Sequence, residues 1–196
     1  MRLIALVIAL LWAVPSVAQT TSIMRVGTGE GAYRYAEVIQ EAGRWVPLDA
    51  GYIGDTHGYH EFYIGGGRTL IASDRLRLIG IAFLDQNNQK QTNVIPWALV
   101  TATPTHDISL SANWFSYFGE GPTQHYLEHS KIEYLFPFKV KAGIGYAGSK
   151  FGTDAWKNKP LITGTLVGTP VGDVEVWGQR LPGNKLSMQL RVVTGW

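Results

Sequence analysis

Cysteine is absent from this sequence, and charged residues are scarce. None of the 196 residues is Cys, and only 16% are Asp, Glu, Lys or Arg. The lack of thiols excludes disulfide frameworks, cysteine-ligated zinc sites and thiol catalysis. Seventeen Lys and Arg against fifteen Asp and Glu give a formal net charge of +2, without the basic excess typical of nucleic-acid-binding proteins. We therefore expect no nucleic-acid partner.

Long apolar runs are also missing beyond the N-terminus. Residues 3–14 are nearly all apolar, Arg2 places a positive charge before them, and small residues occupy positions 16 and 18 after a proline. The run is shorter than the roughly 20 apolar residues of a membrane-spanning helix and ends in the small residues of a cleavage site. The pattern predicts a signal peptide over residues 1–18 and export of the chain.

Helical periodicity is nearly absent, and a period of two takes its place. Only residues 34–42 could form a helical turn, or else the start of a strand. In residues 107–118, apolar side chains fall on one face and small polar side chains on the other. Residues 131–136 and 139–146 alternate in the same way. Each such segment is expected to be a β-strand with one apolar and one polar face.

Ten such strands account for most of the chain. Short turns alternate with longer, more polar connections such as residues 85–90 and 148–159. The pattern predicts an all-β, antiparallel, up-and-down barrel of about ten strands, with eight or twelve as alternatives that depend on residues 22–54. The barrel domain is placed at residues 44–196, and an N-terminal segment at residues 19–43. The strands are expected at residues 44–54, 60–71, 76–85, 91–102, 107–118, 124–136, 139–147, 160–168, 172–181 and 185–196.

The alternation alone fits two kinds of barrel. A soluble barrel turns its apolar faces inward, whereas an outer-membrane barrel turns them toward lipid and keeps polar side chains inside. A soluble, periplasmic lipocalin-like binding barrel would therefore place Trp114 and Ile144 inside. The alternation of connection lengths and the tryptophans near expected strand ends favour the transmembrane form. These tryptophans are Trp45, Trp97, Trp114, Trp156, Trp177 and Trp196.

The last strand carries the most specific signal. Its apolar face consists of Leu186, Met188, Leu190, Val192 and Trp196, with polar side chains opposite. The segment resembles the terminal strand of bacterial outer-membrane β-barrel proteins, which closes the barrel and is similar to the signal that the barrel assembly machinery reads. The resemblance implies a small bacterial outer-membrane β-barrel protein, with outer-membrane lipid, lipopolysaccharide and the assembly machinery as its partners.

The polar faces of the expected strands predict a network of charged side chains inside the barrel. A barrel of about ten strands is narrow, and side chains largely fill it. We therefore expect a polar, side-chain-filled lumen and a structural, interaction or narrow-channel role. The network residues are Lys131, Glu133, Lys139, Lys141, Asp173, Glu175 and Arg191.

Motifs for catalysis and for cofactors are missing. Residues 27–31 lack the preceding strand and the Lys–Ser/Thr pair of a phosphate loop. On a regular strand His125, His129 and Glu133 share one face, but the two histidines lie roughly 13 Å apart, too far to share a metal ion. The sequence favours a protein without catalytic residues, cofactors or metals. The alternative, a lipid-A-modifying outer-membrane enzyme (an acyl hydrolase or transferase), would need Ser and His from different strands.

Replacing Trp196 by Asp tests the interpretation of the last strand. We expect the variant to lose membrane assembly, because a charge replaces the terminal aromatic residue of the closing strand. The measurement is recovery in the outer-membrane fraction, together with faster migration of unboiled than boiled protein on a denaturing gel. Normal assembly of the variant would contradict the interpretation.

Overall fold

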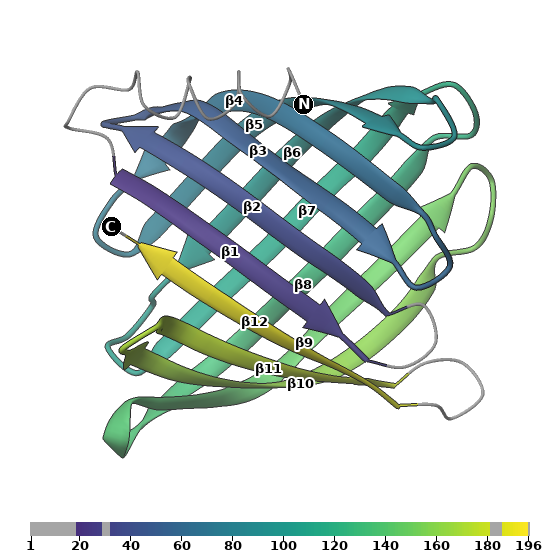
Figure 1. Ribbon diagram of the computed structural model, residues 1–196. Helices are drawn as coiled ribbons and strands as arrows, with labels where there is room; N and C mark the ends of the chain where they lie inside the picture. Colours follow the sequence, from purple (N-terminus) through teal and green to yellow (C-terminus); the bar gives the residue numbers. More distant parts are fainter. Residues whose placement is uncertain (1–18, 29–31, 181–185, 196) are drawn as a thin grey trace.

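The computed structural model is a closed barrel of twelve antiparallel strands, each paired with its neighbours in the sequence (Figure 1). β1 pairs with β12 and closes the sheet on itself. The structure describes residues 19–28, 32–180 and 186–195, so the expected signal peptide at 1–18 and Trp196 lie outside the described residues. The strands are β1 (Gln19–Gly27), β2 (Tyr33–Ala42), β3 (Trp45–Asp55), β4 (His60–Ala72), β5 (Leu76–Asn87), β6 (Thr92–Ala102), β7 (Ile108–Gly119), β8 (Gln124–Phe136), β9 (Val140–Phe151), β10 (Lys157–Thr169), β11 (Gly172–Arg180) and β12 (Leu186–Gly195), with the 3-10 turn η1 (Pro137–Lys139) between β8 and β9.

The expectation of about ten strands is wrong, because the barrel has twelve. The two additional strands, β1 and β2, arise from residues 19–43, so the barrel does not begin at residue 44. Alternation is weak there for a physical reason. In β1, Ile23 is 5% exposed and the adjacent Met24 is 65% exposed, so consecutive apolar side chains occupy opposite faces. A register shift near the end of β2 disturbs its pattern as well.

The connections define two ends of the barrel. At one end, which we call the turn end, β1 begins and β12 ends. We call the opposite end the loop end. Several strands extend further toward the loop end than the sequence predicted. β5, β9 and β10 run through residues that the sequence assigned to loops, so the loop-end connections are shorter than expected. The turn-end connections are residues 43–44, 73–75, 103–107, 137–139 and 170–171, and the described loop-end connections are residues 56–59, 88–91, 120–123 and 152–156.

The outer surface of the barrel is apolar. Ile132, Ile144 and Ile162 lie side by side on β8, β9 and β10, and Ile144 is 65% exposed. Trp114 is 41% exposed. Trp114 and Ile144 therefore point outward, opposite to what a soluble lipocalin-like barrel requires. Apolar side chains in this position are suited to contact with lipid.

The closing strand β12 also turns its apolar side chains outward and its polar side chains inward. Leu186, Met188 and Leu190 are exposed on the outside, Val192 is half-buried, and Gln189 is buried inside. β12 pairs with β1 on one side and with β11 on the other. The sheet therefore has no free edge along this strand. Among the described residues, no helix is long and apolar enough to cross a membrane.

The interior of the barrel has two unlike walls. The inward side chains of β2 to β7 surround an apolar cluster and form what we call the apolar wall, although buried acids such as Glu37 and Glu61 also lie on it. Those of β8 to β12 and β1 form what we call the polar wall. Trp97 and Trp177 point inward rather than lying at an interface. The apolar wall centres on Val46, Tyr63, Ile79, Ile81, Phe83 and Ile95, and the polar wall includes Glu133, Thr163, Thr165, Glu175, Gln179, Ser187 and Gln189.

Replacing Ile144 by Arg tests which face of the sheet meets lipid. In a bilayer we expect the free energy of unfolding to fall by roughly 2–4 kcal/mol, because Arg on the lipid face near mid-membrane is costly. Denaturant titration in lipid vesicles, with gel migration as the readout, measures the change. The matched control is Phe138→Arg in the exposed turn η1, where we expect little change. Equal stability of the wild type and Ile144→Arg would contradict the assignment of faces.

Candidate functional site in the barrel lumen

A group of polar side chains crosses the lumen near its middle. Arg25 of β1 donates to Glu128 Oε1 at 3.1 Å and to His129 Nδ1 at 2.6 Å, both on β8. Tyr33 donates to the same Glu128 oxygen at 2.8 Å, and His129 Nε2 lies 3.0 Å from Gln189 Oε1 of β12. Strands β9 to β12 separate β1 from β8 on one side of the barrel, and β2 to β7 separate them on the other. We call these five residues the transverse cluster.

A β-bulge in β8 places Glu128 and His129 together. The pairing of β8 with β9 shifts register between Leu127 and Ser130, and His129 has a left-handed backbone with φ of 47°. A bulge lets two consecutive side chains point to the same side of a sheet. His129 therefore faces inward while His125 faces outward, so the expected shared face of the two histidines is wrong.

Contacts on both sides hold the transverse cluster in place. The Arg25 guanidinium lies 4.7 Å from the ring centres of Tyr33 and Tyr35, within the range of cation–π attraction. The His129 ring packs edge-on against Trp177 at 4.4 Å. Arg25 is 5% exposed, and its hydrogen bonds to a carboxylate are charge-assisted and therefore strong. Moving Arg25 aside would break its hydrogen bonds and its contacts with the two tyrosine rings.

Two cavities meet at the transverse cluster. The cavity toward the turn end has a volume of about 370 Å³, and the one toward the loop end has a volume of about 620 Å³. Arg25, Glu128 and His129 line both of them. The lumen is thus two chambers divided by one layer of side chains.

Four of the seven expected network residues come together on the polar wall. Lys131 Nζ lies 2.8 Å from Glu133 and 3.3 Å from Glu175, and Arg191 donates to Glu175 at 3.1 Å. The hydroxyls of two threonines on β10 complete the shell of Glu133 at 2.8 and 2.9 Å. These buried carboxylates therefore have both cations and neutral donors around them.

The other three expected network residues lie apart. Lys141 and Asp173 line the cavity toward the turn end, and neither forms an ion pair among the residues that the structure describes. Asp173 instead accepts a hydrogen bond from the backbone of Gly168 at 2.7 Å. Lys139 lies in the exposed turn η1 and does not reach the network.

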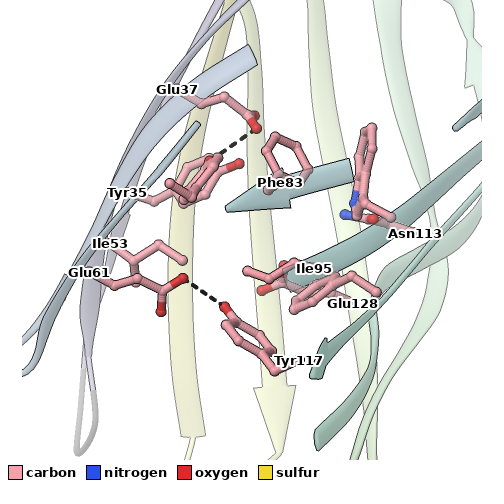
Figure 2. A pocket seen from close by; sticks show the side chains of 12 residues that line it. Tyr35, Glu37, Ile53, Glu61, Phe83, Ile95, Asn113, Tyr117 and Glu128 are labelled. Atoms are coloured by element: carbon pink, nitrogen blue, oxygen red, sulfur yellow. Dashed lines mark hydrogen bonds between the residues drawn. The ribbon is translucent and has the colours of Figure 1, made fainter. Parts of the chain in front are cut away.

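A smaller pocket lies in the apolar wall (Figure 2). Glu37 of β2 accepts from Tyr63 at 3.0 Å. Glu61 of β4 accepts from Tyr59 at 2.6 Å and from Tyr117 at 3.0 Å. Burial raises the pKa of the Tyr59 phenol in the 56–59 connection, with the hydrogen bond to Glu61 as a further cause, so its hydroxyl stays protonated and donates. Between these carboxylates lie the rings of Phe83, Trp97 and Phe115 and the side chains of Ile53 and Ile95.

Several of these residues could not be identified from the sequence. Arg25, Tyr33 and Glu37 lie in strands that alternation did not reveal, so their side chains could not be assigned to a lumen. Glu61 adjoins the expected strand start at residue 60, but its partner Tyr117 is on a distant strand. Among the described residues, no group of three or more His, Asp or Glu is arranged to hold a metal ion.

One Ser–His pair forms between neighbouring strands on the outside of the barrel. Ser116 Oγ of β7 lies 2.7 Å from His125 Nδ1 of β8. Ser116 shares its face with the exposed Trp114 and Phe118, so the pair faces outward. Ser116 is 0% exposed, and no carboxylate is hydrogen-bonded to His125 among the described residues. The geometry fits a hydroxyl that satisfies a histidine at an apolar surface, rather than an accessible nucleophile.

Comparison with known proteins shows the fold. No family model matches the sequence, and no curated protein matches it significantly. The barrel is similar to a solved structure described as KdgM porin (12% identity, 90% of this chain, 98% of that chain, TM-score 0.63) and to a KdgM porin in complex with disordered oligogalacturonate (12%, 90%, 98%, TM-score 0.66). It is also similar to the NanC porin (9%, 89%, 98%, TM-score 0.62). The chain has the fold of a small bacterial outer-membrane β-barrel protein.

Replacing Lys131 by Met tests the ion-pair network of the polar wall. We expect the free energy of unfolding to fall by about 3 kcal/mol, because the substitution leaves Glu133 buried without its cation. Adding Glu133→Gln should recover part of this loss, since the orphaned charge is then gone. The control Lys141→Met lines the same cavity without an ion pair and should change stability little. Denaturant titration in vesicles measures all four proteins, and equal losses in the two lysine variants would contradict the network.

Proposed function

We propose that this chain is an integral barrel of the bacterial outer membrane and acts as a narrow channel with a restricted lumen. The apolar outer surface supports the location, because such a surface requires lipid around it. Lipid and lipopolysaccharide would then contact the outward side chains. The expected signal peptide and the terminal strand support export and recognition by the barrel assembly machinery.

The observation that carries the channel proposal is the transverse cluster. Two chambers, each reached from its own end of the barrel, stop at Arg25, Glu128 and His129. A plug of packed apolar side chains would leave no such chambers. A layer one side chain thick divides the lumen, and displacement of Arg25 would open a path between the two chambers beside Glu128 and His129. Small ions and solutes are the species that such a passage suits.

The ligand of one structural neighbour does not suit this lumen. Oligogalacturonate carries a carboxylate on every sugar, and one KdgM structure is a complex with it. In this chain a polyanion would pass Glu37, Glu61 and Glu128, all of which line the pocket at the level of the transverse cluster. We propose that the channel passes uncharged or cationic solutes of small size instead.

A lipid-A-modifying activity has less support. It would need the Ser116–His125 pair to act on acyl chains at the outer wall. A nucleophile must be reached by its substrate, and Ser116 has no exposed surface. We therefore propose a channel and not an acyl hydrolase or transferase.

Replacing Arg25 by Ala tests the channel proposal. We expect the single-channel conductance in planar bilayers to rise several-fold, because removal of the guanidinium joins the two chambers. The matched control is Arg68→Ala, since Arg68 lies over Trp45 on the outer surface and should leave conductance unchanged. Conductance of Arg25→Ala no higher than that of the wild type would contradict the proposal.

A further inference from the structure

We propose that the pocket of the apolar wall binds a small primary alkylammonium ion. The inference builds on the proposed channel function, because the lumen is the route by which a solute would reach this site. The pocket shares Glu37 and Trp97 with the chamber toward the turn end, and Glu61 and Phe115 with the chamber toward the loop end. Glu128 lines all three spaces. A solute that crosses the transverse cluster therefore passes the pocket.

The first argument is uncompensated negative charge. Glu37 and Glu61 are 7% and 2% exposed, and neither forms an ion pair among the residues that the structure describes. Their hydrogen-bond donors are neutral tyrosine hydroxyls. The inward arginines and Lys131 are already paired with other carboxylates, and Lys141 and Lys159 line the two chambers but not this pocket. A buried carboxylate is stabilised by a cation, and the solute is the available source of one.

A second observation is a further buried acid beside Glu37. Asp49 of β3 is 0% exposed, and no amide, hydroxyl or basic group of the described residues donates a hydrogen bond to either of its carboxylate oxygens. Its electrostatic neighbour is Glu37. Buried polar groups in proteins are rarely left without a partner. Asp49 does not line the pocket itself, but its carboxyl group next to Glu37 strengthens the negative potential that an ammonium group at Glu37 would meet.

The third argument is the aromatic lining. Phe83 packs edge-on between Tyr63 at 5.1 Å and Trp97 at 6.1 Å, and Figure 2 shows Glu37 and Glu61 facing the space that Phe83 borders. Ring faces attract cations, and the same rings and Ile95 offer apolar contact to an alkyl chain. Carboxylates within an aromatic wall therefore fit a ligand with an ammonium head and a short hydrocarbon tail.

The pocket itself is small, although it opens to both chambers. It leaves about 50 Å³ open to the centres of water-sized groups. One water needs roughly 10–15 Å³ on this measure, so about four non-hydrogen atoms fit. Propylammonium has four. A bare metal ion is a poorer fit, since no metal-binding group of His, Asp and Glu is present in the described part of the chain.

The experiment is a binding titration on the folded protein in a non-ionic detergent, so that no detergent ammonium group competes. Isothermal calorimetry or saturation-transfer NMR compares propylammonium with uncharged 1-propanol and anionic propionate. We expect saturable binding of propylammonium, roughly tenfold or more tighter than that of 1-propanol, and no binding of propionate. Equal binding of propylammonium and 1-propanol would overturn the proposal, because the carboxyl groups would then be acting as neutral acids.

The variants separate the site from a general effect of charge. Glu37→Gln with Glu61→Gln should weaken propylammonium binding by about tenfold or more, while Asp173→Asn, the same kind of change in the chamber toward the turn end, should leave it unchanged. If the double variant fails to show the gel shift of a folded barrel, Phe115→Leu tests the ring contact with both carboxylates retained, and should weaken propylammonium but not 1-propanol. Unchanged propylammonium affinity in the folded variants would overturn the site.

The conductance of Arg25→Ala decides the channel proposal separately. Loss of the predicted binding with the expected rise in conductance would refute only the ammonium site. Binding without that rise in conductance would support the site and refute the channel.

Discussion

Pairing of β1 with β12 is the constraint on which the rest of the structure depends. In lipid, every backbone N–H and C=O must find a partner within the protein, so a sheet can span the membrane only if its first and last strands pair. The register that achieves this sets Arg25 opposite Arg191. Adjacent like charges on paired strands repel, but here each guanidinium points to a different carboxylate, Glu128 or Glu175. The register that closes the sheet therefore also places Arg25 and Arg191 beside their carboxylate partners in the lumen.

The two interior walls handle buried charge differently. On the polar wall, cations and carboxylates neutralise each other within the protein, and threonine hydroxyls satisfy the remaining oxygen positions. On the apolar wall, Glu37 and Glu61 lie among rings, and their hydrogen-bond donors among the described residues are neutral tyrosine hydroxyls. The charges of the polar wall are therefore compensated within the protein, whereas Glu37 and Glu61 on the apolar wall could accept a cation from a solute. The transverse cluster joins the two walls, because Arg25 comes from the first and contacts the tyrosines of β2.

The sequence predicted the fold class and ten of the strand positions, because alternation is a local property that survives in regular strands. It did not reveal β1 and β2, where apolar side chains such as Ile23 and Met24 occupy both faces. Network residues on regular stretches, such as Glu175 and Arg191, could be assigned to one face in advance. Residues whose roles depend on distant strands, such as Arg25 and Glu61, could not, since the partner of each is set by closure of the barrel rather than by spacing along the chain.

The bulge at His129 has a consequence for the whole of β8. It adds one residue to the count, so the half of the strand before it and the half after it follow opposite alternation. Lys131 and Glu133 are inside, and Ile132 and Tyr134 are outside, only because of that extra residue. The extra residue in β8 therefore determines that its charged side chains point into the lumen and its apolar side chains point outward. At the bulge, the number of residues in β8 matters more for the structure than the identity of any one of them.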